Sequence, residues 1–372
     1  MHGQGIYIHI PFCLQKCNYC DFLSFQAYEK ICQNSSAGPG VIEQYVNSLL
    51  YEMEQYKTKA QIDTVYIGGG TPTALPSHLL CKILNAVLEL TDNTKNAEIT
   101  VEANPGTLTS EYLSELKAHG VTRLSIGLQT TKPHLLKAIN RIHTMADFID
   151  NFHAARNAGF DNINADLMFA LPGQTLQDWQ DTLEELIALS PEHISAYSLT
   201  PAENTPLWDA LDAGQIHLPC DETDRSMYHM ARKLLTRAGY IHYELSNFAK
   251  PGFKSRHNIN CWRRVPYRAF GLGGHSFDGA KRWHNTEDMN EYLTNNHTPQ
   301  NVEHLSETDT LAETMILGLR LMEGIPEMDI PQVFSREIEA QIKKGLLARK
   351  DGKVCLTPLG MDLANQVFMA FS

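Results

Sequence analysis

Three cysteines near the start of the chain, Cys13, Cys17 and Cys20, constrain its fold and chemistry more than any other feature. They are separated by three and then two residues, and they follow an apolar run from Gly5 to Ile10 that predicts a β-strand. Three thiolates at this spacing can hold three irons of a [4Fe-4S] cluster and leave the fourth iron without a protein ligand. The motif therefore predicts a cluster with one open metal position at the end of a strand.

A zinc site is the alternative for such a group of thiols, but a structural zinc needs four ligands. Asp21 and Phe22 come directly after the third cysteine, and Cys32 is the only nearby candidate for a fourth ligand. The other four cysteines are scattered and do not indicate a disulfide framework; they are Cys81, Cys220, Cys261 and Cys355. We therefore expect a reducing compartment.

Composition excludes several classes of protein. With 43% hydrophobic and 20% charged residues, the 372-residue chain can bury a core, and its length predicts one large domain with an appendage. A formal net charge of -12, without a basic run, argues against binding nucleic acid or anionic lipid. No stretch approaches the ~18 apolar residues that span a bilayer, and the N-terminus does not resemble a signal peptide. We expect a cytoplasmic protein that is not integral to a membrane.

The first 200 residues alternate between short β-branched runs and longer helical patterns. The predicted strands are 5–11, 63–68, 98–103, 123–128, 162–169 and 193–199, and the predicted helices are 41–56, 77–90, 109–118, 145–158 and 176–189. Parallel strands need such crossovers, so the fold class is α/β, as an open doubly wound sheet or a partial barrel. Polar or glycine-rich groups follow nearly every strand, which favours a partial (β/α)6, TIM-like barrel over residues 1–218.

The pattern changes after residue 218. A helix over 222–237 is followed by a Gly- and aromatic-rich region within 219–305. Residues 306–372 read as helices 308–321, 336–344 and 358–368 around a hairpin, 347–356, with Asp351-Gly352 as its turn. This outline predicts a C-terminal α+β domain resembling a winged helix, with a packing or docking role rather than DNA binding.

The cysteine motif resembles that of the radical S-adenosylmethionine (SAM) enzymes. In that family the amino and carboxylate groups of SAM chelate the fourth iron, and an electron from the cluster generates a deoxyadenosyl radical. The resemblance implies a SAM site made of the following residues: Tyr7, Gly69, Gly70, Thr71, Glu102, Gln129, Arg141, Asp166 and Thr200. Independently of the family, glycines permit close backbone approach, and an arginine suits a bidentate grip on a carboxylate.

Together these residues resemble one branch of the family, that of oxygen-independent coproporphyrinogen III oxidase. The oxidases carry a fourth cysteine where this chain has Phe22, so the chain resembles instead the heme-chaperone (HemW) group of the branch. That group has a His-Asn-x-x-Tyr-Trp motif, matched by His257 to Trp262 with Cys261 in place of the tyrosine. The resemblance implies heme as a third cofactor, with His257 or the Cys261 thiolate as candidate ligand, and an unidentified heme-acceptor protein as partner.

Two other functions compete with a heme chaperone. A radical enzyme would oxidise coproporphyrinogen III or modify heme, and a tetrapyrrole sensor would use the C-terminal domain on DNA, against the acidic charge. Two further departures from the family are Ala170 and Ala269, each where glycine is usual. Neither the oligomeric state nor the cleavage of SAM follows from the sequence.

Overall fold

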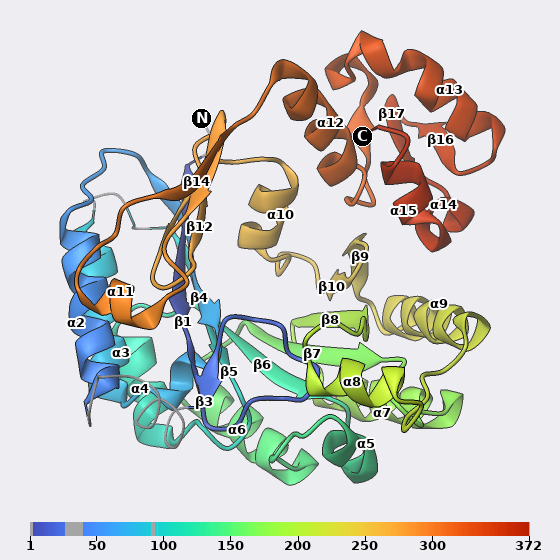
Figure 1. Ribbon diagram of the computed structural model, residues 1–372. Helices are drawn as coiled ribbons and strands as arrows, with labels where there is room; N and C mark the ends of the chain where they lie inside the picture. Colours follow the sequence, from blue (N-terminus) through green and yellow to red (C-terminus); the bar gives the residue numbers. More distant parts are fainter. Residues whose placement is uncertain (1–2, 27–39, 91–93, 95, 372) are drawn as a thin grey trace.

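The computed structural model describes residues 3–26, 40–90, 94 and 96–371 (Figure 1). Cys32, the candidate fourth ligand of a zinc site, lies outside the described residues. No helix in the described part of the chain is long and apolar enough to cross a membrane.

Six parallel strands form the centre of the molecule, as the alternating pattern predicts. They lie side by side in chain order as β1 (Gln4–Ile10), β4 (Ile62–Gly69), β5 (Glu98–Ala103), β6 (Arg123–Gln129), β7 (Ile163–Phe169) and β8 (His193–Ser198). The strands curve into an open arc that does not close on itself (Figure 1). The partial barrel is confirmed. Because all six strands run the same way, their carboxyl ends meet at one rim.

Helices cover the outside of this arc (Figure 1). They are α2 (Val41–Glu54), α3 (Ser77–Glu89), α4 (Ser110–Ala118), α5 (Pro133–Ala138), α6 (Met145–Asn157) and α7 (Leu176–Leu189). Both α6 and α7 begin with a capping box, in which Thr144 pairs with Asp147 and Thr175 with Asp178. Helix α5 was not predicted. The bounds of the other five differ from the predicted ones by at most two residues, because the local sequence already marks these ends.

Helix α8 (Pro206–Asp212) follows β8. The region after residue 218 begins with α9 (Asp221–Arg237) and then adds strands to both ends of the sheet. Beyond β8 lie β10 (Asn247–Ala249) and β9 (Ile241–Glu244). Beyond β1 lie β11 (Tyr267–Phe270), β12 (His275–Phe277), β13 (Lys281–His284) and β14 (Gln300–His304). Strand β11 runs parallel to β1, with Tyr7 opposite Ala269. Twelve described strands thus share one sheet, an extension that no local pattern in the sequence predicts.

Two short helices and two short strands complete this part. Helix α10 (Arg256–Trp262) packs on β4, and α11 (Met289–Leu293) packs on α2. Strands β2 (Phe12–Cys13) and β3 (Phe25–Gln26) pair beside the end of β1.

The C-terminal residues form their own hydrophobic core around Met315, Phe334 and Val354. This core lies among α12 (Glu307–Gly318), β15 (Ile325–Pro326), α13 (Ser335–Lys343), β16 (Leu347–Lys350), β17 (Lys353–Leu356), α14 (Pro358–Asp362) and α15 (Ala364–Phe368). Strands β16 and β17 form the predicted hairpin, and Asp351 and Gly352 have φ of 52° and 73°, as a two-residue primed turn requires. The helix predicted over 358–368 is wrong in detail, because it is interrupted at Leu363.

Candidate functional site

The three cysteines line one cavity of about 380 Å³ at the carboxyl ends of the parallel strands, which we call the cysteine cavity. Cys13 ends β2, and Cys17 and Cys20 lie on the loop that follows it. All three thiols are free, and burial is the main cause that raises the pKa of Cys13 and of Cys20. Three free thiols facing one cavity fit a group that binds thiolates, because metal coordination offsets the cost of deprotonating them.

The cysteine loop is held by hydrogen bonds to backbone carbonyls on both sides. Lys16 Nζ donates to the carbonyls of Phe22 and Ser24 at 3.1 and 3.0 Å. Asn18 donates to the carbonyl of Ala138 at 2.9 Å, which joins the loop to α5. The side chains of Lys16 and Asn18 thus tie the loop to its own C-terminal part and to α5.

The glycine segment after β4 lies against the strand that leads to the cysteines. Gly70 N–H donates to the Ile10 carbonyl and Thr71 N–H to the Phe12 carbonyl, each at 2.8 Å. A Cβ on Gly70 would lie 2.8 Å from the Phe12 oxygen, so only glycine fits there. Thr71 Oγ1 donates to Cys13 Sγ at 3.6 Å, so this segment contacts a cysteine directly.

Two carboxylates of the cysteine cavity, Glu102 and Asp166, lie on β5 and β7, with β6 between these strands. Glu102 Oε1 accepts from the Tyr66 hydroxyl at 2.6 Å, and Oε2 accepts from Gly69 N–H at 3.2 Å. The pKa of Glu102 is raised to about 7, mainly by burial and also by the negative charge of Asp166, while the hydrogen bond from Tyr66 opposes this shift. Asp166 accepts from Ser125 at 3.2 Å and from Asn164 at 2.7 Å. Both groups can accept hydrogen bonds from a polyhydroxylated ligand.

Arg141 and Lys16 are the cations among the described residues that line the cysteine cavity. Arg141 Nη1 donates to Asn104 Oδ1 at 2.6 Å and its Nη2 to the Tyr19 hydroxyl at 3.2 Å. Its Nε is buried and has no partner among the described residues. An incompletely paired guanidinium in a cavity is suited to binding a carboxylate.

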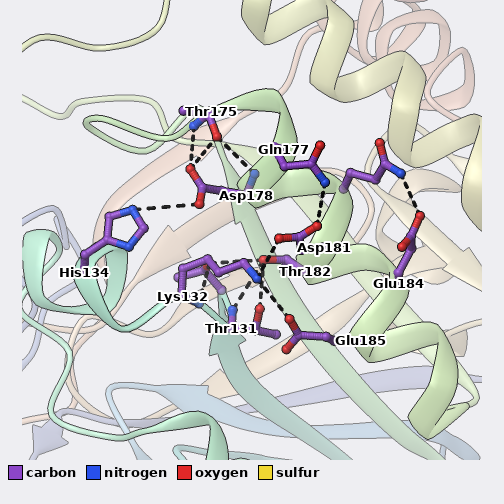
Figure 2. Close-up of polar contacts among 12 residues, drawn as sticks. Thr131, Lys132, His134, Thr175, Gln177, Asp178, Asp181, Thr182, Glu184 and Glu185 are labelled. Atoms are coloured by element: carbon purple, nitrogen blue, oxygen red, sulfur yellow. Dashed lines mark hydrogen bonds and ion pairs between the residues drawn. The ribbon is translucent and has the colours of Figure 1, made fainter.

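Gln129 ends β6 in the left-handed region, with φ of 67°, and its Oε1 accepts from the Tyr197 hydroxyl at 3.2 Å. The turn after it is tied to α7, as Figure 2 shows. Thr131 and Thr182 hydroxyls lie 3.2 Å apart, and Lys132 Nζ pairs with Asp181 and Glu185 at 3.0 Å each. These contacts with α7 stabilise the strained turn and thereby fix the position of Gln129.

The predicted SAM residues do not all lie together. Gly69, Gly70, Thr71, Glu102, Gln129, Arg141, Asp166 and Thr200 line the cysteine cavity. Tyr7 lines a neighbouring cavity instead, with its hydroxyl 3.1 Å from His9 Nδ1. Only Gly69 and Glu102 of this set line both.

This second, larger cavity has a volume of about 750 Å³, and we call it the histidine cavity. His9, His257 and His275 line it, with Cys261 and Phe22. Phe22, at the position of the oxidases' fourth cysteine, is 63% exposed and lines both cavities. The histidine cavity therefore begins where the cysteine loop ends.

His257 is buried at the N-terminal part of α10. Its Nδ1 lies 3.1 Å from Thr64 Oγ1, and its ring stacks on Tyr66 at 4.9 Å. Burial and the charge of Arg123 lower the pKa of His257 to about 4, so the imidazole is neutral at pH 7. Its Nε2 has no hydrogen-bond partner among the described residues.

Cys261, one turn further along α10, has its pKa raised to about 11 by burial. The thiol is therefore neutral at pH 7 unless a metal binds it. The imidazole of His257 can bind iron as it stands, whereas the Cys261 thiol would first have to lose its proton. Both remain predictions.

Three tyrosines contact the site residues without having been predicted: Tyr19, Tyr66 and Tyr197. Tyr66 and Tyr197 lie on β4 and β8, and Tyr19 lies between two of the cysteines. In the sequence each is only a tyrosine near the end of a predicted strand. Such tyrosines are too common to be identified as site residues before the fold is known.

Comparison with known proteins gives the class first. Residues 7–186 match the radical SAM superfamily, and residues 305–363 match the HemN C-terminal domain. The solved structure of coproporphyrinogen III oxidase (HemN) from Escherichia coli, a radical SAM enzyme, has a TM-score of 0.82 over 99% of this chain and 90% of its own, at 20% identity. This likeness shows the fold.

Relatives of higher identity give the family. The heme chaperones HemW of Bacillus subtilis and of Lactococcus lactis are each 34% identical over 99% of this chain and over 99% and 97% of their own lengths. A mitochondrial radical S-adenosyl methionine domain-containing protein 1 from Danio rerio is 30% identical over 92% of this chain and 80% of its own. The chain belongs to the HemW family of radical SAM proteins. Membership implies that it binds a [4Fe-4S] cluster and SAM.

Proposed function

We propose that this protein is a heme chaperone, which binds heme in the histidine cavity and passes it to an acceptor protein in the cytoplasm. The carrying observation is the histidine cavity itself, which brings a neutral imidazole, His257, to the wall beside the cysteine loop. A neutral imidazole is the usual axial ligand of heme iron. The relatives named as heme chaperones support the same function.

In this proposal Cys13, Cys17 and Cys20 hold the cluster. Gly70, Glu102 and Arg141 would hold SAM, Arg141 by pairing with its carboxylate and Glu102 by accepting from its ribose hydroxyls. When bound, the cluster supplies an electron to SAM. The chain's own residues orient the cofactor, and the hydroxyl of Tyr66 keeps Glu102 aimed into the cavity.

The second candidate is a radical enzyme acting on coproporphyrinogen III, which the shared fold with HemN favours. The two are separated by assaying the anaerobically reconstituted protein with SAM, a reductant and coproporphyrinogen III. We expect tight heme uptake without formation of protoporphyrinogen. Protoporphyrinogen produced over many turnovers would refute the chaperone function.

The ligand assignment has its own test. We expect His257→Ala to weaken heme binding at least about tenfold and to shift the Soret band, whereas His153→Ala, an exposed histidine on α6, changes neither. Cys261→Ala is the companion variant, and we expect it to leave the Soret band in place because its thiol is neutral. An unchanged spectrum for His257→Ala would remove this ligand.

A further inference from the structure

Three metal-ligating side chains gather at the mouth of the histidine cavity, apart from the cysteines. They are His275 at the start of β12, His284 at the end of β13 and Glu287 on the following loop. The strand register places His275 opposite His284, and their ring centres are 4.9 Å apart. One ligand atom from each of the three lies within 4.8 Å of the others.

The loop that carries Glu287 is held in place by hydrogen bonds of the two residues that precede it. Asn285 is buried, and its side chain donates to Glu52 Oε1 and to the Gly271 carbonyl at 2.8 Å each. Thr286 is also buried, and its carbonyl accepts from Gly273 N–H at 2.8 Å. The three side chains are therefore presented by a fixed frame, which lowers the entropic cost of collecting them around an ion.

Their hydrogen bonding also suits a metal. His284 Nδ1 lies 2.8 Å from the Asn285 carbonyl oxygen. Because a carbonyl can only accept a hydrogen bond, Nδ1 carries the proton, and Nε2 of the same ring keeps its lone pair for a metal. The side-chain amide of Asn301 donates to Nε2 of His284 at 2.9 Å. Asn301 is exposed on β14, so its side chain can change rotamer and leave Nε2 to a metal. His275 and Glu287 make no hydrogen bond or ion pair with any described residue outside the trio.

We propose that His275, His284 and Glu287 bind one divalent transition-metal ion of the Zn²⁺ class. Two imidazoles and one carboxylate are a donor set that such ions accept while keeping positions open. Since His275 and Glu287 line the histidine cavity, the open positions face it and take water or an anionic oxygen ligand. The inference goes beyond the proposed function, because it needs neither heme nor the cysteine cluster.

The test uses the full chain without a histidine tag, loaded anaerobically with its cluster so that the cluster thiols are occupied. Co²⁺ is titrated as a spectroscopic probe, and Zn²⁺ is then used to displace it. We expect one equivalent of Co²⁺ per chain, displaced by Zn²⁺. His275→Ala and Glu287→Gln should each raise the Kd for Co²⁺ at least about tenfold.

Two control variants keep the test independent of folding. His304→Ala, an exposed histidine on the neighbouring β14, should leave the Kd unchanged. Asn301→Gly, which frees His284 Nε2, should leave binding as tight or tighten it. Equal affinity in wild type and in His275→Ala, or no Co²⁺ uptake, would overturn the metal site. Normal heme uptake by the same samples would leave the proposed function standing.

Discussion

The two cavities of this protein share a wall but are assembled differently. The cysteine cavity is built from consecutive strand ends and the loops that follow them, between β1 and β8. The histidine cavity is built where the chain returns after more than 200 residues to lay β11 beside β1. The first is a property of the parallel barrel, whereas the second exists only once the last third of the chain is in place.

The sharpest way to separate the cavities is to remove a cysteine. We expect Cys17→Ala to reduce iron and acid-labile sulfide to background, since two thiolates remain to hold the cluster. Cys220→Ala, an exposed cysteine outside both cavities, should retain both elements. Full iron and sulfide content in Cys17→Ala, measured after anaerobic reconstitution, would contradict the cluster assignment.

The histidine cavity depends on one buried carboxylate, Glu98, which accepts the backbone N–H groups of Arg256 and His257 at 3.1 Å each. Glu98→Ala would leave two N–H groups of the first turn of α10 unpaired. We expect it to lower the free energy of unfolding by about 3 kcal/mol.

Urea unfolding measures this loss, and the exposed Glu115→Ala on α4 should stay within about 0.5 kcal/mol of wild type. A loss as small in Glu98→Ala as in Glu115→Ala would show that α10 does not depend on this carboxylate.

Glu102 lies on the shared wall and makes stability depend on pH. Because its pKa is raised from 4.5 to about 7, the folded state holds the proton more tightly than the unfolded one. Its contribution is therefore fully present below about pH 4.5 and is lost as the pH rises through 7. The full shift corresponds to about 3 kcal/mol, and solvent contact at the cavity reduces this to about 1–2 kcal/mol.

Comparing unfolding free energies at pH 5.5 and 8 for wild type and Glu102→Gln isolates this contribution. We expect the variant to lose that part of the pH dependence. An unchanged slope would show that Glu102 does not carry the proton.

The smallest expected effect concerns Ala170, which follows β7 with φ of 57°, a conformation that suits glycine. Ala170→Gly removes this strain, and we expect a gain of about 0.5–1 kcal/mol, part of the relief being offset by the freer unfolded chain. Ala269→Gly is the matched control, since Ala269 lies within β11 and has no positive φ; there glycine should destabilise. A loss of stability in Ala170→Gly would contradict this account.

The sequence was most informative where local patterns decide the structure. Alternating strands and helices predicted the barrel, and polar groups at strand ends predicted the lining of the cysteine cavity, because parallel strands bring those ends together. The Asp351-Gly352 turn was equally readable, since few residues tolerate its backbone.

Long-range pairing was not readable. Nothing local in Tyr267–Phe270 indicates that it pairs with β1 rather than with another strand, and this pairing forms the histidine cavity. Tyr7, which the family resemblance assigns to the SAM site, lines the histidine cavity, and its part in binding SAM stays a prediction. A sequence motif identifies the residue types of a site. Which cavity their side chains line depends also on the strand that pairs with them.

The pairing of β1 with β11 also sets an order of events during synthesis. Gly5 lies opposite Tyr267, so one edge of the first strand stays without its partner while the ribosome adds the 261 residues between them. At ~5–20 residues per second, this interval lasts roughly 15–50 s. Throughout it, the nascent barrel presents an open strand edge to neighbouring chains, and the binding cavity beside that edge is completed only near the end of translation.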